Sequence, residues 1–252
     1  MNELIEDKLV PHPGKPLVYS SRHIQERRRR ILKEARRMIA ENGLENFSIR
    51  TLCKNADVAQ RTLYNAFQNK ERIIAMAIRE AYEDVNKYMK YRTSATTLEG
   101  IVDRLIFVNT RNLRAANYTR AVTAIYFSPA AKRDVWNVLR DMVFLNLRQW
   151  LKAAAKRGGL HDWVDTEEVA ADIANLEYAT IHDWALGRLS DEQYVKRLVL
   201  TVLSLIAGVT RGEEHERAIA MLRRIRRTGQ LPEFPKPVFV PPTAAEEEEV
   251  AA

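Results

Sequence analysis

The sequence predicts an all-α protein with an N-terminal three-helix domain, containing a helix-turn-helix, followed by a C-terminal helical bundle. Three observations support this fold class. Apolar residues recur at three- and four-residue spacing along most of the chain. N-capping residues and glycines mark the starts and ends of these segments. No segment alternates apolar and polar residues over the length of a strand, so we expect essentially no sheet.

Composition indicates a soluble globular chain of 252 residues, with 46% hydrophobic and 29% charged residues. The single cysteine, Cys53, excludes an internal disulfide and a cysteine-rich metal site, and it favours a reducing compartment. The longest uncharged apolar stretch, Leu198–Thr210, has 13 residues. A membrane-spanning helix needs about 20. With no signal-like apolar run near the N-terminus, we expect a cytoplasmic protein that does not enter a membrane.

A first helix is predicted from about Ile24 to Asn42. Ile31, Ala35 and Ile39 recur on one face, and basic side chains occupy most of the remainder. Gly43 then supplies the left-handed residue that commonly follows a helix.

Two short helices with a tight turn between them are predicted next. Ser48 is a suitable N-cap for a helix that runs to about Asn55, and a second helix extends from about Ala59 to Ala66. Apolar residues between these helices can form one small core, which leaves long donors, amides and a phenol outside. The side chains expected to be exposed are Arg50, Gln60, Arg61, Thr62, Tyr64 and Asn65.

This pattern is typical of a helix-turn-helix, in which the second helix enters the major groove of double-stranded DNA. Arg61 could bind both acceptors of a guanine, and Gln60 or Asn65 could bridge the donor and acceptor of an adenine. Thr62 and Tyr64 could bind phosphates, which fixes register without reading sequence. The same string would also fit two amphipathic helices that never touch nucleic acid.

The charge distribution favours a polyanionic partner. Residues 20–92 contain 17 Lys or Arg and nine Asp or Glu, an excess of +8, whereas the whole chain carries +7. Such an excess increases both the rate and the affinity of binding to DNA, although a solvated basic face is the ordinary alternative. Lys70 follows Asn69, a plausible N-cap, so a phosphate there would meet both an ammonium and a helix N-terminus.

The rest of the chain is predicted to be helical up to about residue 228. Capping pairs are expected at Thr96 with Glu99, Asp165 with Glu168, and Ser190 with Gln193. Ser128 and Pro129 are expected to start a long helix. The predicted helices span residues 70–91, from 96 onward, 118–127, from 128 to about 157, from 165 to about 187, 191–210 and 213–227.

The helix that contains Leu198–Val209 is apolar nearly all round, so it must be covered on every side. The cover could be the chain's own helices or a second copy. We favour a second copy, because a two-fold dimer doubles the contacts on a palindromic DNA site.

No arrangement of residues indicates catalysis, a metal or a cofactor. The five histidines are scattered, and no phosphate-binding glycine loop or nucleophile elbow is present. Glu177, His182 and Asp183 lie near one another on one predicted helix, which we interpret as ordinary polarity of the bundle. Aromatic residues of the bundle could line a cavity for an apolar ligand, or they could fill its core. The predicted cavity residues are Phe107, Tyr126 and Tyr178.

Residues 28–79 resemble the DNA-binding region of the tetracycline-repressor (TetR) family. The resemblance is carried by AENGLENFS at the end of the first helix, by SIRTLCKNADVAQRTLYNAF, and by NKERI at the start of the fourth helix. It implies a homodimeric repressor or activator whose bundle encloses a small-molecule cavity and dimerises through two C-terminal helices. It also implies DNA-backbone contacts for Thr62, Tyr64 and Lys70, and operator-dependent contacts for Gln60, Arg61 and Asn65.

Three residues depart from the family pattern. Asp57 stands where Gly is usual, Ala59 replaces the usual Ser or Thr cap, and Arg61 replaces a common Gly. Aspartate tolerates left-handed backbone better than most residues, whereas an alanine cap could cost about 1 kcal/mol. The departures leave the motif intact but put the operator sequence beyond inference.

We therefore predict four segments: residues 1–19, a disordered extension; 20–69, the DNA-binding domain; 70–228, the bundle; and 229–252, a disordered tail rich in proline and glutamate. The predicted function is a TetR-type regulator that binds a palindromic operator as a homodimer and is released by a small-molecule ligand. A helical adaptor without DNA recognition is the alternative, and an all-helical enzyme is a third possibility.

Overall fold

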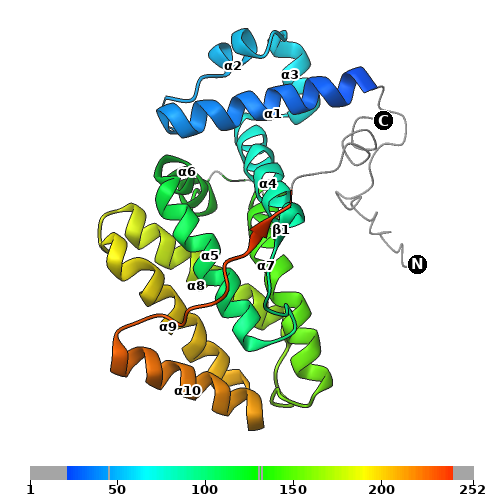
Figure 1. Ribbon diagram of the computed structural model, residues 1–252. Helices are drawn as coiled ribbons and strands as arrows, with labels where there is room; N and C mark the ends of the chain where they lie inside the picture. The colour runs from blue at the N-terminus through cyan, green and yellow to red at the C-terminus, as the bar shows by residue number, and fades with distance from the viewer. Residues whose placement is uncertain (1–21, 45, 130, 132, 241–252) are drawn as a thin grey trace, which may run out of the picture.

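The computed structural model describes residues 22–44, 46–129, 131 and 133–240. Within these ranges the chain forms ten helices and one two-stranded sheet. The first three helices lie at one end of the molecule, and α4 leads from them into a bundle of the remaining six (Figure 1). The predicted extension over residues 1–19 lies outside the described residues.

The N-terminal domain consists of α1 (Arg22–Asn42), α2 (Ile49–Asn55), α3 (Gln60–Phe67) and the start of α4 (Lys70–Tyr88). These bounds confirm the predicted starts and ends of the first four helices to within three residues. The helices share a core of fully buried side chains, because each presents one apolar face to the others. Its largest members are Ile31, Ile39, Leu52, Leu63, Phe67, Ile73 and Ile74.

Side chains set the ends of these short helices. The Ser48 hydroxyl accepts a hydrogen bond from the Thr51 amide at 3.3 Å, and Asn69 Oδ1 accepts from the Arg72 amide at 2.7 Å. Asp57 adopts the left-handed backbone predicted for it, with φ of 50°. The turn between α2 and α3 therefore has the conformation that the helix-turn-helix reading requires.

The bundle contains six helices: α5 (Leu98–Arg114), α6 (Ala116–Tyr126), α7 (Arg133–Lys156), α8 (Thr166–Ala185), α9 (Asp191–Val209) and α10 (Gly212–Thr228). Asp165 caps α8, and Ser190 forms a capping box with Gln193, as predicted. The hydroxyl that caps α5 belongs to Thr97 rather than Thr96. Ser128 does not start α7, because its carbonyl accepts from the Ala131 amide in a turn that precedes the helix.

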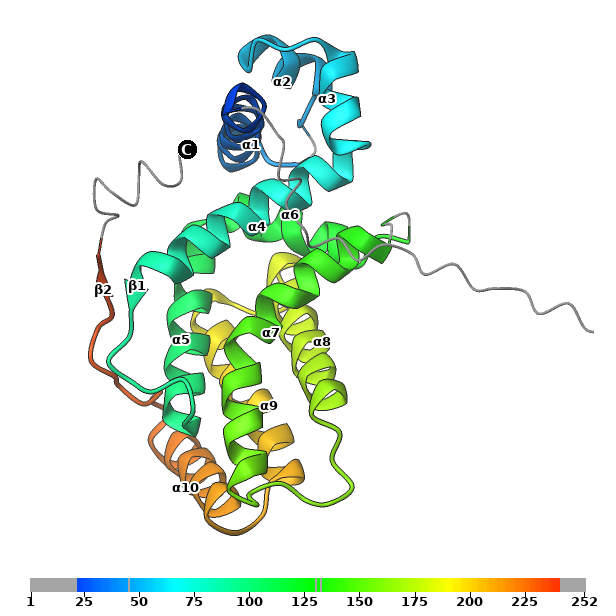
Figure 2. The same cartoon turned by 90° about the vertical axis from the view of Figure 1, so that its right-hand side faces the viewer.

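Most apolar side chains of α9 are buried within a single copy of the chain, in which α9 lies among the other bundle helices (Figure 2). Leu198, Val199, Leu203 and Ile206 are fully buried against α5, α8 and α10, and α9 lies between α8 and α10 in Figure 1. One face of α9 stays accessible, with Ser204 and Gly208 exposed and Leu205 half-buried, so a second copy on that face stays a prediction. Helix α10, which begins at Gly212, packs against another face of α9.

A small antiparallel sheet joins the end of α4 to the C-terminal part of the chain. In it β1 (Met89–Lys90) pairs with β2 (Val238–Phe239), Met89 lying opposite Phe239. The Val240 amide also donates to the Tyr88 carbonyl at 2.9 Å. We call residues 229–240 the C-terminal strap, which Figure 1 shows running from α10 along the bundle to α4.

The strap corrects the prediction of a disordered tail from residue 229, and it adds a sheet of two-residue strands to a chain expected to have essentially no sheet. Pro232 is buried, and Leu231 and Phe234 pack against the core, so residues 229–240 have a defined path. Strands of two residues are too short to show alternation. Residues 241–252, with the glutamate run of the tail, lie outside the described part of the chain.

Candidate DNA-binding surface and bundle cavity

Helix α3 is anchored through one face and presents the other to solvent. Leu63 and Phe67 are fully buried, while the side chains of the opposite face are accessible. Gln60, Arg61 and Asn65 are exposed, and Tyr64 retains 38% of its surface. The structure thus brings the predicted base-reading residues together on one helix face, with Thr62 half-buried beside them and Arg50 exposed on α2.

Helix α1 fixes the position of the α2–α3 turn through polar contacts. The Arg30 Nε donates to the Ala56 carbonyl at 2.9 Å, and Asn55 Nδ2 donates to Glu34 at 2.7 Å. The Arg28 guanidinium lies 4.9 Å from the centroid of the Phe67 ring. These contacts join α1 to the α2–α3 turn and to the C-terminal end of α3, so α3 is held in a fixed position relative to α1.

Lys70 lies at the N-terminus of α4, directly after the Asn69 cap. Its ammonium sits 5.5 Å from the centroid of the Phe47 ring, and the side chain remains partly exposed. Four backbone amides at a helix N-terminus lack partners within the helix, so they attract anions. The position combines a fixed cation with this dipole beside the α3 surface.

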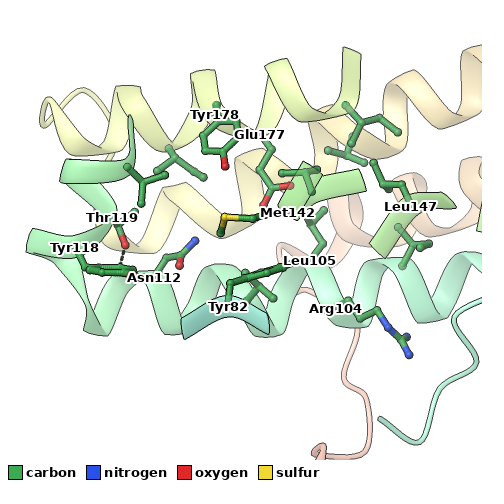
Figure 3. A pocket seen from close by; sticks show the side chains of 17 residues that line it. Tyr82, Arg104, Leu105, Asn112, Tyr118, Thr119, Met142, Leu147, Glu177 and Tyr178 are labelled. Carbon is green, nitrogen blue, oxygen red and sulfur yellow. Dashed lines mark hydrogen bonds between the residues drawn. The ribbon is translucent and has the colours of Figure 1, made fainter. Parts of the chain in front are cut away.

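A cavity of about 80 Å³ lies inside the bundle. It is bounded by residues from α4 to α9, and most of its lining is apolar. Figure 3 shows Glu177 and Tyr178 extending from one side, with Asn112, Leu105 and Tyr82 opposite. Tyr82 belongs to α4, so the cavity is in contact with the helix that carries the reading domain.

A buried polar network forms part of the cavity wall. Asn109 Nδ2 donates to Glu177 Oε1 and to the Leu105 carbonyl, both at 2.9 Å. Asn109 Oδ1 accepts from the Tyr194 hydroxyl and, at 3.1 Å, from Asn112 Nδ2. Burial raises the pKa of Glu177 to about 7, and the hydrogen bond from Asn109 opposes that rise.

The N-terminal domain matches a known family. Residues 31–77 fit the family model described as bacterial regulatory proteins, tetR family. The N-terminal domain is a TetR-family DNA-binding domain. The matched residues cover α2 and α3 completely, so the family model coincides with the exposed α3 surface and its supporting helices.

Two relatives and one solved structure match most of the chain. The HTH-type transcriptional repressor KstR of Rhodococcus jostii is 27% identical over 202 residues, covering 77% of this chain and 90% of the relative. KstR of Mycolicibacterium smegmatis is 28% identical over 192 residues, covering 72% of this chain and 88% of the relative. A TetR transcriptional regulator from Rhodococcus sp. RHA1 has the same fold, with a TM-score of 0.58 at 17% identity over 75% of this chain and 99% of that one.

These TetR relatives are transcriptional regulators, so the chain is a DNA-binding regulator with a helix-turn-helix. The individual DNA contacts of Arg50, Gln60, Arg61, Thr62, Tyr64, Asn65 and Lys70 stay predictions. Among the helices that the structure describes, none has the length and apolar character needed to cross a membrane.

The three predicted ligand residues of this protein are placed differently. Tyr178 lines the cavity. Tyr126 stacks behind it, with ring centroids 4.0 Å apart, and donates its hydroxyl to Asn175. Phe107 packs instead on Tyr91, 5.5 Å away, and neither it nor Tyr126 is among the lining residues. Sequence reasoning found the aromatic cluster but not which ring faces the cavity.

The polar residues of the cavity were missed, although the sequence carries a signal for them. Glu177 lies four residues from both Ile173 and Ile181 on the apolar stripe of α8. Its sequence neighbours separate from it: the His182 ring lies 4.8 Å from the Phe127 ring, and Asp183 pairs with Arg188 at 2.9 Å. A charged residue on an otherwise apolar stripe indicates a buried polar site.

The alanine that precedes α3 departs from the TetR pattern, and the missing cap lowers the free energy of unfolding. Ala59 has extended backbone and makes no side-chain hydrogen bond to the first turn of α3. Ala59→Ser is expected to raise the free energy of unfolding by about 1 kcal/mol, because serine can accept from a free amide. Urea denaturation measures the change.

Ala66→Ser is the matched control, since Ala66 is exposed near the other end of α3. It should give no gain, because a serine inside a helix has no unpaired amide to satisfy. Equal stabilisation by the two substitutions would contradict a capping effect at residue 59.

Proposed function

We propose that this protein is a transcriptional repressor that binds a palindromic operator as a homodimer and is released by a small-molecule ligand. The observation that carries the proposal is the α3 surface, on which Gln60, Arg61 and Asn65 are exposed while Leu63 and Phe67 anchor the helix. The curated relatives are named as repressors, which supports the sign of regulation.

In the proposed complex α3 enters the major groove. Arg61 donates to a guanine, and Gln60 or Asn65 binds an adenine. Thr62, Tyr64 and Lys70 bind phosphates on either side, and Arg50 adds positive charge from α2. The excess of +8 over residues 20–92 supplies the sequence-independent part of the affinity.

The homodimer follows from the geometry of operators rather than from the burial of α9. One eight-residue recognition helix reads only a few base pairs, and a two-fold pair doubles the reading. We place the second copy on the outer faces of α8 and α9. A groove there combines apolar side chains, including Leu176 and Leu189, with the polar Gln193 and Lys196.

Ligand release is proposed to act through α4. A ligand larger than the present cavity must widen it, and Tyr82 places α4 in its wall. Movement of α4 would change the separation of the two α3 helices in the dimer, so they would no longer fit successive major grooves. The ligand acts only as far as it favours that second arrangement over the first.

Fluorescence anisotropy with duplexes from the region upstream of the protein's own gene tests the DNA-binding step. We expect specific binding that weakens steeply with salt. Arg61→Ala should lower the affinity by roughly tenfold to a hundredfold and relax sequence preference, as expected for loss of one bidentate base contact.

Arg79→Ala is the control, because it removes the same charge from α4, where Arg79 pairs with Glu83 at 2.5 Å. It should change affinity little and specificity not at all. Failure to bind any of the duplexes, even at low salt, would favour the adaptor alternative. Equal effects of the two substitutions would show that α3 does not read bases.

A further inference from the structure

The carboxyl group of Glu177 is buried in the cavity wall without a cation beside it. Only 7% of the surface of Glu177 is exposed. Asn109 is the hydrogen-bond partner of Oε1, and within the described ranges Oε2 has no hydrogen bond. Among the residues that the structure describes, no cation acts on the Glu177 carboxyl group. A buried charge in this state is costly, and a ligand can reduce that cost.

The hydrogen-bond network fixes what Glu177 offers to a ligand. Asn109 must direct its amide nitrogen toward the Leu105 carbonyl, because a carbonyl can only accept. The second hydrogen of the same nitrogen is therefore donated to Glu177 Oε1. Tyr194 and Asn112 both donate to Asn109 Oδ1, which saturates the amide. Glu177 Oε2 is left as the acceptor that faces the cavity.

Two tyrosines of the wall do not compete for this role. Tyr118 donates its hydroxyl to the Ala77 carbonyl at 3.2 Å, and Tyr178 donates to the Leu139 carbonyl at 2.8 Å. With their hydroxyls engaged, these residues contribute mainly ring surface to the cavity. Aromatic rings attract cations through their electron-rich faces, most strongly where water is excluded.

The positive residue of the wall is held elsewhere. Arg104 donates to the Gly100 carbonyl at 2.8 Å, and its guanidinium lies 4.3 Å from the centroid of the Tyr91 ring. Figure 3 shows Arg104 at the far end of the cavity, with its charged group directed away from Glu177. The two charges are thus separated, and the centre of the cavity has a negative and aromatic character.

We propose that the cavity binds organic amines, compounds with an apolar body and one protonated nitrogen, and that Glu177 is the counter-ion of that nitrogen. The proposal rests on the ligand site of the proposed function and names its chemical class. Folding has already removed the Glu177 carboxylate from water. Ligand binding therefore adds only the free-energy cost of removing the ligand's ammonium group from water. Ring faces and the apolar wall offset that remaining cost.

Calorimetric titration of the full-length protein with matched pairs of compounds tests the proposal. The pairs are benzylamine with benzyl alcohol and 4-phenylbutylamine with 4-phenyl-1-butanol, which differ only in the polar end. At about pH 8 such alkyl amines are protonated, as a lysine side chain is. At least one amine should bind roughly tenfold or more tightly than its alcohol, because a hydrogen bond to a charged group is stronger than a neutral one.

Two substitutions assign the preference to a residue. Glu177→Gln should remove it, because glutamine keeps an acceptor for Asn109 but carries no charge. Glu168→Gln should retain it, since Glu168 is exposed on the same helix. Equal binding of amine and alcohol, a preference that survives Glu177→Gln, or no binding of either amine would each overturn the proposal. Tighter binding of the alcohols would indicate a neutral ligand class.

The titrations contain no DNA, so their outcome does not depend on whether the protein binds an operator. A second measurement adds the same amines to a preformed DNA complex and follows its anisotropy. Amine binding without any DNA binding would sustain this inference and contradict the proposed function. If the protein binds DNA but binds no amine, and no amine perturbs the DNA complex, the DNA-binding part of the proposed function stands and this inference is contradicted.

Discussion

Phe67→Ala is expected to lower the free energy of unfolding by about 3 to 5 kcal/mol. The Phe67 ring is fully buried at the end of α3, and the Arg28 guanidinium lies 4.9 Å from its centroid. Removing the ring leaves a cavity between α1, α3 and α4 and withdraws the support of that cation. The position of α3 depends on the same contacts, so specific DNA affinity should fall as well.

Urea denaturation and anisotropy together separate these two effects. Tyr64→Ala is the control, because Tyr64 lies less than one turn away on α3 and is 38% exposed. It should change stability by less than about 1 kcal/mol and affect only DNA binding. If the Phe67→Ala and Tyr64→Ala proteins had the same free energy of unfolding, Phe67 would not belong to a core that α3 shares with α1 and α4.

Glu177→Gln is expected to stabilise the protein by about 3 kcal/mol at pH 8 and by almost nothing near pH 4. Burial raises the pKa of Glu177 from 4.5 to about 7 in the folded state. The folded protein therefore binds more protons than the unfolded chain between these values. The free energy of unfolding contributed by Glu177 therefore falls as the pH rises from about 4.5 to about 7. Above about pH 7 the full cost of the buried carboxylate lowers stability.

The measurement is urea denaturation of both proteins at several pH values from about 4 to 8. The difference between them isolates Glu177 from other titrating groups. Glu168→Gln is the control at an exposed site on the same helix and should give a small difference that varies little with pH. A pH-independent gain in Glu177→Gln would mean that Glu177 is not the buried titrating group.

The N-terminal domain could be predicted because its signals are local. Ser48 and Asn69 cap the helices that follow them, and Asp57 accepts the left-handed backbone that the turn requires. Each of these features depends on residues within three or four positions. The apolar spacing of short helices then determines which side chains are left exposed, so the α3 surface follows from the same pattern.

The bundle was predicted less completely because its decisive contacts are long-range. Part of the cover of α9 comes from α10, which a helical pattern cannot place in space. Asn109 and Glu177 meet across 68 positions of sequence. Period and composition indicate that both are polar residues on apolar helices, but they do not show that the two share a hydrogen bond. Tyr126 and Tyr178 were both predicted to line the cavity, and the helical pattern does not show that Tyr178 lines it while Tyr126 stacks behind.

The pairing of β1 with β2 has a consequence for how the protein is made. The partner of Met89 is Phe239, so β1 can pair with β2 only after synthesis has passed residue 239. Closing so long a loop is entropically unfavourable until the intervening helices have folded and brought its ends together. The β1–β2 pairing therefore forms after the helices between the two strands, and a chain truncated before Val238 lacks this contact with the end of α4.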